Sequence, residues 1–349
     1  MPLIVNSPAE WRGPEMARRT DWIHRFTPAE VAEIDAALRH ARARGATFDS
    51  MTKEDFPLPG FQERISYSLD VLENGPGMFL FRGFPVERYS KDDLRYIYWG
   101  IGRNYGTAIS QSSAGDLLGD VKNFNVDLWG AKGRGYTSNA KLSYHTDFSD
   151  VVCLFVLQTA RSGGLSIIGS TVTLHNEVAR RRPDLLDVLY QPYPLSWQGQ
   201  EPENAKPWYQ MPVFTVHKGK FACVYVRSHI LSSQRFDDAP RLTPKQLEAM
   251  DLLDELAADP AIHYSEMFQP GDLQMVNNHV LFHSRTAFED YDEPEKRRHL
   301  LRLWLAVPNS RELSPLLSPI YGEGQSGAVR GGFPSLTGQH IYETRVSVT

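Results

Sequence analysis

Apolar residues return every three or four positions in three segments of the chain, and each segment begins with a residue suited to cap a helix. The first follows Thr27, which stands three residues before Glu30 in the pattern of a capping box. Ser90 and Thr243 begin the other two segments in the same way. The pattern predicts three helices, and a further helical segment is expected at residues 173–189.

Short runs rich in β-branched, aromatic and leucine residues predict strands between and after these helices. The runs cover residues 77–84, 150–159, 213–226, 271–278 and 299–307. The third run is expected to fold back on itself as a hairpin, because Lys218-Gly219 supplies a tight turn. Most strands follow residue 140 and the helices are set apart, which predicts an α+β fold built on an antiparallel sandwich or barrel.

Two long stretches, residues 107–141 and 191–211, follow neither pattern and are expected to be loops. Both combine turn-forming residues with aromatic side chains, such as Trp129 in the first and Trp197 in the second. Loops of this length in a compact domain either cover a functional site or are disordered. The sequence leaves open whether they close over a substrate or only decorate the surface.

Composition narrows the class of protein. The 349 residues carry a net charge of −5, which argues against a nucleic-acid partner. Cys153 and Cys223 both stand in apolar runs, so we expect core residues rather than a disulfide, and a cytoplasmic setting. The first residues lack the pattern of a signal peptide, and no stretch approaches the ~20 apolar residues of a membrane span.

Three residues form a candidate metal site. His145 and Asp147 are one residue apart, so they share a face if this segment is extended. Alone, that pair is common by chance, but His283 follows a predicted strand and can complete a set of two histidines and one carboxylate. Such a set binds iron(II) in non-haem oxygenases and leaves coordination positions open. Zinc usually takes a fourth ligand, often a thiolate, and neither cysteine suits that role.

Two arginines stand out because of their surroundings. Arg298 and Arg302 are four residues apart and flank the apolar run that follows His283. A guanidinium buried in such a run needs a carboxylate partner. We expect a co-substrate to bring that carboxylate, with Arg302 as the first candidate and Arg298 as the second.

The order of these residues resembles that of the Fe(II)/2-oxoglutarate-dependent dioxygenases of the TauD/TfdA (taurine dioxygenase-like) superfamily. Three further motifs are similar to those of the family, and the similarity extends from about Gly77 to Pro308. They are MFLFRGFP at 78–85, SGGLS at 162–166 and NNHVLFHSRTAF at 277–288.

The resemblance implies one domain with a distorted double-stranded β-helix (jelly roll) core and flanking helices. Its parts would be a mostly helical extension (1–76), the jelly-roll core (77–310) and a C-terminal tail (311–349). It also implies Fe(II), 2-oxoglutarate and O₂ as cofactor and co-substrates. The implied iron ligands are His145, Asp147 and His283. Arg302 would bind the distal carboxylate of 2-oxoglutarate, with a hydrogen bond from Ser166.

The implied reaction is hydroxylation or desaturation of an unactivated C–H bond in a small polar metabolite, with release of succinate and CO₂. Because Asp147 is present, the site leaves no room for the halide of related halogenases. Two alternatives remain: a cupin-like iron oxygenase that does not use 2-oxoglutarate, and a non-catalytic jelly-roll binding protein. A homo-oligomer is compatible with the sequence. The candidate substrate-binding residues are Gln111, Asn123, Asn125, Lys141, Phe148 and Arg285.

Overall fold

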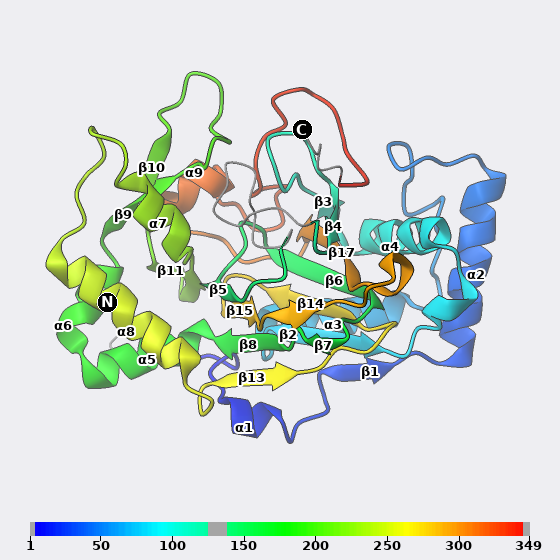
Figure 1. Cartoon of the computed structure of the whole chain (residues 1–349), viewed down its shortest axis with the longest axis horizontal. Helices are drawn as coiled ribbons and strands as arrows, with labels where there is room; N and C mark the ends of the chain where they lie inside the picture. Colours follow the sequence, from blue (N-terminus) through cyan, green and yellow to red (C-terminus); the bar gives the residue numbers. More distant parts are fainter. Residues whose placement is uncertain (1–3, 125–137, 345–349) are drawn as a thin grey trace.

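The computed structural model describes residues 4–124 and 138–344 of the chain. Its described part has a double-stranded β-helix core with helices packed outside (Figure 1). Seven strands form the larger sheet in the order β1-β2-β14-β6-β17-β3, and β4 also pairs with β17. Only β1 and β2 run parallel. The strands are β1 (Ile23–Arg25), β2 (Met78–Arg82), β3 (Thr107–Ala108), β4 (Leu118–Val121), β6 (Val151–Gln158), β14 (Leu273–Asn277) and β17 (His299–Ala306).

Four antiparallel strands form the smaller sheet in the order β13-β8-β15-β5. They are β5 (Leu142–His145), β8 (Ser166–Ser170), β13 (His263–Glu266) and β15 (Leu281–Arg285). His283 pairs with His145 on one side, and on the other side Arg285 pairs with Ser166. Directly paired residues of antiparallel strands point to the same face. These four side chains therefore share one face of the smaller sheet.

Three two-stranded ribbons complete the β-structure of the described residues. They are β7 (Ser162–Gly163) with β16 (Phe288–Glu289), β9 (Pro192–Ser196) with β10 (Trp208–Pro212), and β11 (Phe214–His217) with β12 (Lys220–Cys223). The last ribbon turns at Lys218 and Gly219, which both have positive φ, as the sequence predicted.

The helices begin where the capping residues predicted. Thr27 and Thr243 both form complete capping boxes, and the Ser90 side chain accepts from the Asp93 amide. The predicted segment 173–189 is two helices, because Pro183 cannot continue the first and starts the second. The helices are α1 (Gly13–Met16), α2 (Pro28–Ala43), α3 (Gln62–Asn74), α4 (Lys91–Tyr105), α5 (Thr171–Arg181), α6 (Pro183–Leu189), α7 (Arg227–Ser233), α8 (Pro244–Ala258) and α9 (Ser318–Tyr321), with 3₁₀ turns at Val86–Arg88, Pro294–Lys296 and Pro315–Leu317.

Strand β17 separates two environments. Leu301, Leu303 and Leu305 pack in the apolar cluster that includes residues of α2, α3 and α4. Because side chains alternate along a strand, Arg302 and Trp304 point to the opposite face, toward the interior of the jelly roll. Cys153 and Cys223 are buried and free, as predicted.

The prediction of loops at 107–141 and 191–211 was wrong in part. The first stretch contains β3 and β4, which both pair with β17. They were missed because they are short and because β4 carries Gly119 and Asp120, which are poor strand formers. The second stretch forms most of the β9–β10 ribbon, whose prolines disguise it as a loop. Asn125 and Trp129 lie outside the described residues.

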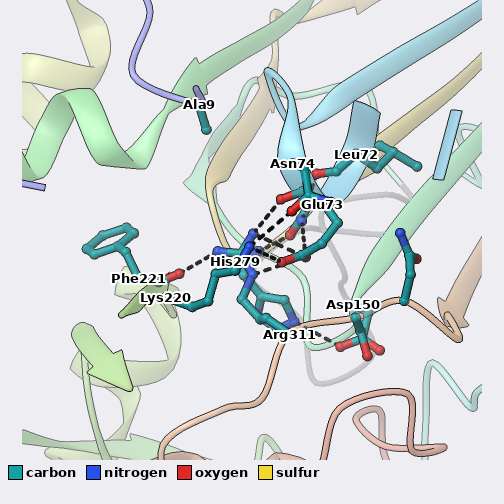
Figure 2. A network of polar contacts seen from close by, with 12 residues as sticks. Ala9, Leu72, Glu73, Asn74, Asp150, Lys220, Phe221, His279 and Arg311 are labelled. Carbon is teal, nitrogen blue, oxygen red and sulfur yellow. Dashed lines mark hydrogen bonds and ion pairs between the residues drawn. The ribbon is translucent and has the colours of Figure 1, made fainter. Parts of the chain in front are cut away.

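The C-terminal residues pack back onto the domain. Figure 2 shows Arg311 between two elements of the core: it contacts the Glu73 carboxylate at 3.1 Å and donates to the Phe221 carbonyl at 2.5 Å. Further on, Ile341 forms a parallel bridge with Asp116, and the Asp120 carboxylate accepts from the Thr344 amide. The segment returns beside β3 and β4 (Figure 1). No helix in residues 4–124 or 138–344 is both long and apolar enough to span a membrane.

Candidate active site

His145, Asp147 and His283 come together in the structure, with one possible ligand atom from each within 4.8 Å of the others. His145 ends β5 and lies opposite His283 on β15, and their ring centroids are 4.3 Å apart. Asp147 follows two residues after His145. Its Oδ1 is 3.8 Å from His145 Nε2 and its Oδ2 is 3.6 Å from His283 Nε2.

Hydrogen bonds around the triad hold its side chains in place. The His145 Nδ1 lies 2.7 Å from the Ser143 carbonyl, so Nδ1 carries the proton and Nε2 is left for a metal. The Asp147 amide donates to Asn278 Oδ1 at 3.0 Å. The Trp304 indole donates to Asp147 Oδ2 at 2.9 Å. These contacts orient His145 and Asp147, whereas Nδ1 of His283 is buried without a hydrogen-bond partner among the described residues.

The electrostatics of the site favour the protonation states that a divalent metal needs. Burial alone would raise the pKa of Asp147, but His283, Arg302, His145 and the Trp304 N–H together lower it. Burial, followed by the neighbouring His145, lowers the pKa of His283 to about 3. A carboxylate at Asp147 and a neutral imidazole at His283 are the forms in which these two groups bind a metal. Two imidazoles and one carboxylate fit iron(II) with open positions for small molecules.

Arg302 lies directly beside the triad. Its Nη1 is 3.9 Å from Asp147 Oδ2, and its guanidinium carbon is 5.1 Å from the centroid of the Trp304 ring. Gln111 orients it: Oε1 accepts from Arg302 Nε at 2.6 Å, and Nε2 donates to the Arg302 carbonyl at 3.1 Å. Gln111, predicted as a substrate residue, therefore contacts Arg302.

Arg298 and Arg285 form a second cationic group around Phe288. Their guanidinium carbons are 5.0 and 4.6 Å from its ring centroid. In both arginines Nη1 is buried without a hydrogen-bond partner among the described residues. Burial lowers the pKa of Arg298 to about 9 and that of Arg285 to about 10. Because a guanidinium stays charged in proteins, these shifts indicate buried cations that lack sufficient counter-charge.

The Asp290 carboxylate attracts both cations and raises the pKa of each, which partly offsets their burial. It also accepts a hydrogen bond from the Arg298 backbone amide at 2.8 Å. Two guanidinium groups against one carboxylate leave one positive charge. Ser166, which pairs with Arg285 across the strands, donates to Gln274 Oε1 at 3.4 Å. Gly164 has no side chain beside Arg298, and a Cβ there would lie 3.6 Å from Arg298 Nε. The two buried guanidinium groups therefore keep hydrogen-bonding capacity that a further acceptor could use.

The other predicted substrate residues have different surroundings. Arg285 donates to the carbonyls of Ser138 and Ala140, so it also holds the backbone before β5. Lys141 is exposed, with its ammonium 5.7 Å from the Tyr144 ring centroid. Asn123 is half-buried, and Asn125 lies outside the described residues.

Phe148 is the residue after Asp147, and its side chain is buried. Its ring lies 5.5 Å from that of His229 in α7 and 5.7 Å from that of Phe333 in the C-terminal segment. His279 is also buried, and its Nε2 lies 2.9 Å from Asp150 Oδ1, as Figure 2 shows. Both residues are buried neighbours in sequence of a triad member: Phe148 of Asp147, and His279 of His283.

Trp304 and Phe333 were missed by the sequence reasoning. Trp304 had a signal, because it alternates with Arg302 on a strand face that carries the candidate anchor. Phe333 had none, because it stands in an irregular segment without periodicity.

Comparison with known proteins agrees with this geometry. The family described as "Taurine catabolism dioxygenase TauD, TfdA family" matches residues 42–304. The chain belongs to this family, and it is a non-haem iron- and 2-oxoglutarate-dependent dioxygenase. The family membership that the sequence motifs indicated is confirmed.

Two curated relatives match over most of their length. FR-33289 synthase of Streptomyces rubellomurinus is 27% identical over 317 residues, which cover 90% of this chain and 94% of that protein. Taurine hydroxylase-like protein SAT17 of Stachybotrys chartarum is 26% identical over 309 residues, covering 86% and 79%.

Two solved structures share the fold. One is asparagine oxygenase in complex with Fe(II), 2S,3S-3-hydroxyasparagine and succinate, with a TM-score of 0.62, 16% identity and coverage of 81% of this chain and 93% of that one. The other is the non-haem iron oxygenase OrfP in complex with Fe and α-ketoglutaric acid, with a TM-score of 0.60, 14% identity and the same coverage. The double-stranded β-helix expected from the sequence is confirmed.

Proposed function

We propose that His145, Asp147 and His283 hold the iron(II) of this dioxygenase. The observation that carries the assignment is the convergence of one donor atom from each residue within 4.8 Å, from separate strands and one loop. When bound, iron would supply the oxidising chemistry, in which 2-oxoglutarate and O₂ give succinate and CO₂, with one oxygen atom of O₂ in succinate and the other in the hydroxyl group of the product. The residues of the chain orient these molecules.

We further propose Arg298 as the anchor of the distal carboxylate of 2-oxoglutarate, in place of Arg302. The metal-binding keto acid and the second carboxylate stand at opposite ends of 2-oxoglutarate. Arg302, 3.9 Å from the triad carboxylate, is too close to the metal site to meet the far end. The buried, under-paired guanidinium of Arg298 supports the assignment, since an arriving carboxylate would satisfy its orphan N–H. Ser166 is proposed to contribute its hydroxyl.

With Arg298 as the anchor, Arg302 becomes the candidate contact for the substrate. Its position beside Asp147 and its two contacts with Gln111 support the recognition of an anionic group close to the reacting carbon. We therefore propose that the substrate is a small polar metabolite with an acidic group. Asparagine oxygenase was solved with 3-hydroxyasparagine, and OrfP was also solved with (3S)-hydroxy-L-arginine; both ligands are amino acids that carry a carboxylate. Hydroxylation is the proposed reaction.

The proposed partner is a small molecule and not a nucleic acid, in line with the net charge of −5. The cytoplasm is the proposed setting, in line with two free, buried cysteines.

The test is an anaerobic titration of the protein with Fe(II) and then 2-oxoglutarate, followed by the weak visible charge-transfer band of the ternary complex. We expect stoichiometric iron and a band that saturates with 2-oxoglutarate. Iron binding without a band would support the cupin-like alternative, and no iron binding would support a non-catalytic protein. A panel of small acids, including L-asparagine and L-arginine, scored by succinate release, then identifies the substrate.

A further inference from the structure

Residues 324–333 of the C-terminal segment pack beside the triad, although the family match ends at residue 304. Two side chains of this segment are buried, namely Arg330 and Phe333. The part of the chain that borders the metal site is therefore larger than the part that defines the family.

Arg330 fastens the segment to the elements that carry the metal ligands. Its Nε donates to Asp150 Oδ1 at 3.0 Å, and Asp150 also binds His279 at 2.9 Å. Asp150 lies three residues after Asp147, and His279 lies four residues before His283. Arg330 also donates to the carbonyl of Gln325 at 2.8 Å, which fixes the segment's own turn. With all three side chains buried, this anchor holds the segment in one position.

Two glycines then bring the backbone close to the site. Gly331 and Gly332 have φ of +86° and +70°, which other residues rarely adopt. The Gly332 amide donates to the Phe148 carbonyl at 2.6 Å. A Cβ on Gly331 would lie 2.6 Å from that same oxygen. The contact is possible only without side chains, and it places the next residue, Phe333, against the site.

The Phe333 ring packs against aromatic rings beside the triad and also lines an open cavity. Its centroid is 6.2 Å from that of Trp304, which binds Asp147, and 5.7 Å from that of Phe148. Phe333 also lines a cavity of about 410 Å³, together with Trp197, Ile109 and Gly331. Neither Trp304 nor a member of the triad lines that cavity. Phe333 thus borders both spaces.

We propose that Phe333 determines which substrates fit, because its ring closes the metal site off from this cavity. The substrate would place its anion at Arg302 and its carbon chain toward Phe333, so that the ring sets the longest chain accepted. The substrate class is then a short amphipathic acid. This inference rests on the proposed function, since it needs the metal site and the role of Arg302.

The test uses straight-chain monocarboxylates from acetate to decanoate as probes. Each is titrated anaerobically into the protein loaded with Fe(II) and 2-oxoglutarate, and the change in the visible band gives an apparent Kd. In Phe333→Ala we expect the affinity for the longer acids, relative to that for butanoate, to rise by about tenfold or more. One methylene in an apolar pocket is worth roughly that factor in binding. The affinities for Fe(II) and 2-oxoglutarate should stay unchanged. Leu336→Ala, an exposed residue of the same segment, should behave as the wild type.

Phe333→Leu is a more conservative variant, which keeps the test valid if the alanine variant misfolds. It should shift the chain-length preference in the same direction by a smaller factor. An unchanged length profile in both variants overturns the proposal, and so does a wild-type band that no acid of the series perturbs. A wild type without any band contradicts the proposed metal and co-substrate sites instead, so the two failures are distinct.

Discussion

The indole nitrogen of Trp304 donates a hydrogen bond of 2.9 Å to Oδ2 of Asp147. Arg302 Nη1 lies 3.9 Å from the same oxygen. Since Oδ2 is held by these two groups, Oδ1 is the oxygen left for a metal. If Asp147 binds iron as proposed, we expect Trp304 to act as a positioning residue through this carboxylate.

Replacing Trp304 with phenylalanine should weaken iron binding by about 10- to 100-fold, the usual cost of losing a group that orients a metal ligand. The Kd for Fe(II), or for Co(II) as a spectroscopic substitute, is the measurement. Trp22→Phe is the matched control, because the Trp22 indole is buried but has no hydrogen-bond partner among the described residues. Equal metal affinity in the Trp304 variant and the wild type would show that the hydrogen bond does not position the carboxylate.

His145→Ala and His283→Ala should each abolish iron binding and turnover and leave the fold intact. The apolar core lies in other residues, so circular dichroism should not change. Bound iron per chain is the measurement. His217→Ala, which removes a histidine paired with Glu312 away from the triad, should bind iron normally. Wild-type activity in either triad variant would remove that residue from the site.

Asp147→Gly should lose hydroxylation even when halide is supplied. The substitution removes the carboxylate, leaves the Trp304 N–H without its acceptor and takes away the negative charge beside Arg302, and one change rarely rebuilds the surrounding contacts. Product analysis by mass spectrometry in the presence of chloride is the measurement. A chlorinated product would contradict this expectation.

Arg298→Leu should raise the Kd for 2-oxoglutarate by about two to four decades, because a buried charge pair that loses one partner costs about 3–5 kcal/mol. Without 2-oxoglutarate, the variant should be at least as stable as the wild type, since it removes an under-paired buried cation. Thermal unfolding with and without 2-oxoglutarate measures both effects. Arg302→Leu is the matched comparison and should keep most of the co-substrate affinity. If Arg302→Leu has the larger effect, Arg302 is the anchor, as the sequence first indicated.

Arg311→Met should lower the free energy of unfolding by about 3 kcal/mol, because it leaves the buried Glu73 carboxylate without its main partner. Lys220, 3.3 Å from Glu73, keeps the loss at the lower end of the range (Figure 2). Arg161→Met removes the exposed pair with Glu289, which water screens, and should cost far less than Arg311→Met. Urea unfolding followed by circular dichroism is the measurement. Equal losses in the two variants would contradict the role of burial.

Local features of the sequence determined much of this protein. The capping boxes at Thr27 and Thr243 place two helices, since a cap depends only on residues within one turn. Alternation along an extended segment predicted that His145 and Asp147 lie together; they do, although the strand ends at His145 and Asp147 stands in the loop after it. His283 was predicted from its motif. The jelly-roll fold and the 2-oxoglutarate-dependent chemistry were implied by the resemblance of these motifs, in their order, to the TauD/TfdA family.

Only the tertiary structure decided how distant residues share the site. Arg298 and Arg302 look equivalent along the chain, and they differ because one meets Arg285 and Phe288 while the other meets Asp147. Strand β4 exists because β17 offers it a partner, which no local propensity reveals. Phe333 reaches the site through a long-range anchor on Asp150 and two glycines with positive φ. Contacts between residues far apart in sequence depend on the packing of the whole chain, and a local pattern carries no trace of them.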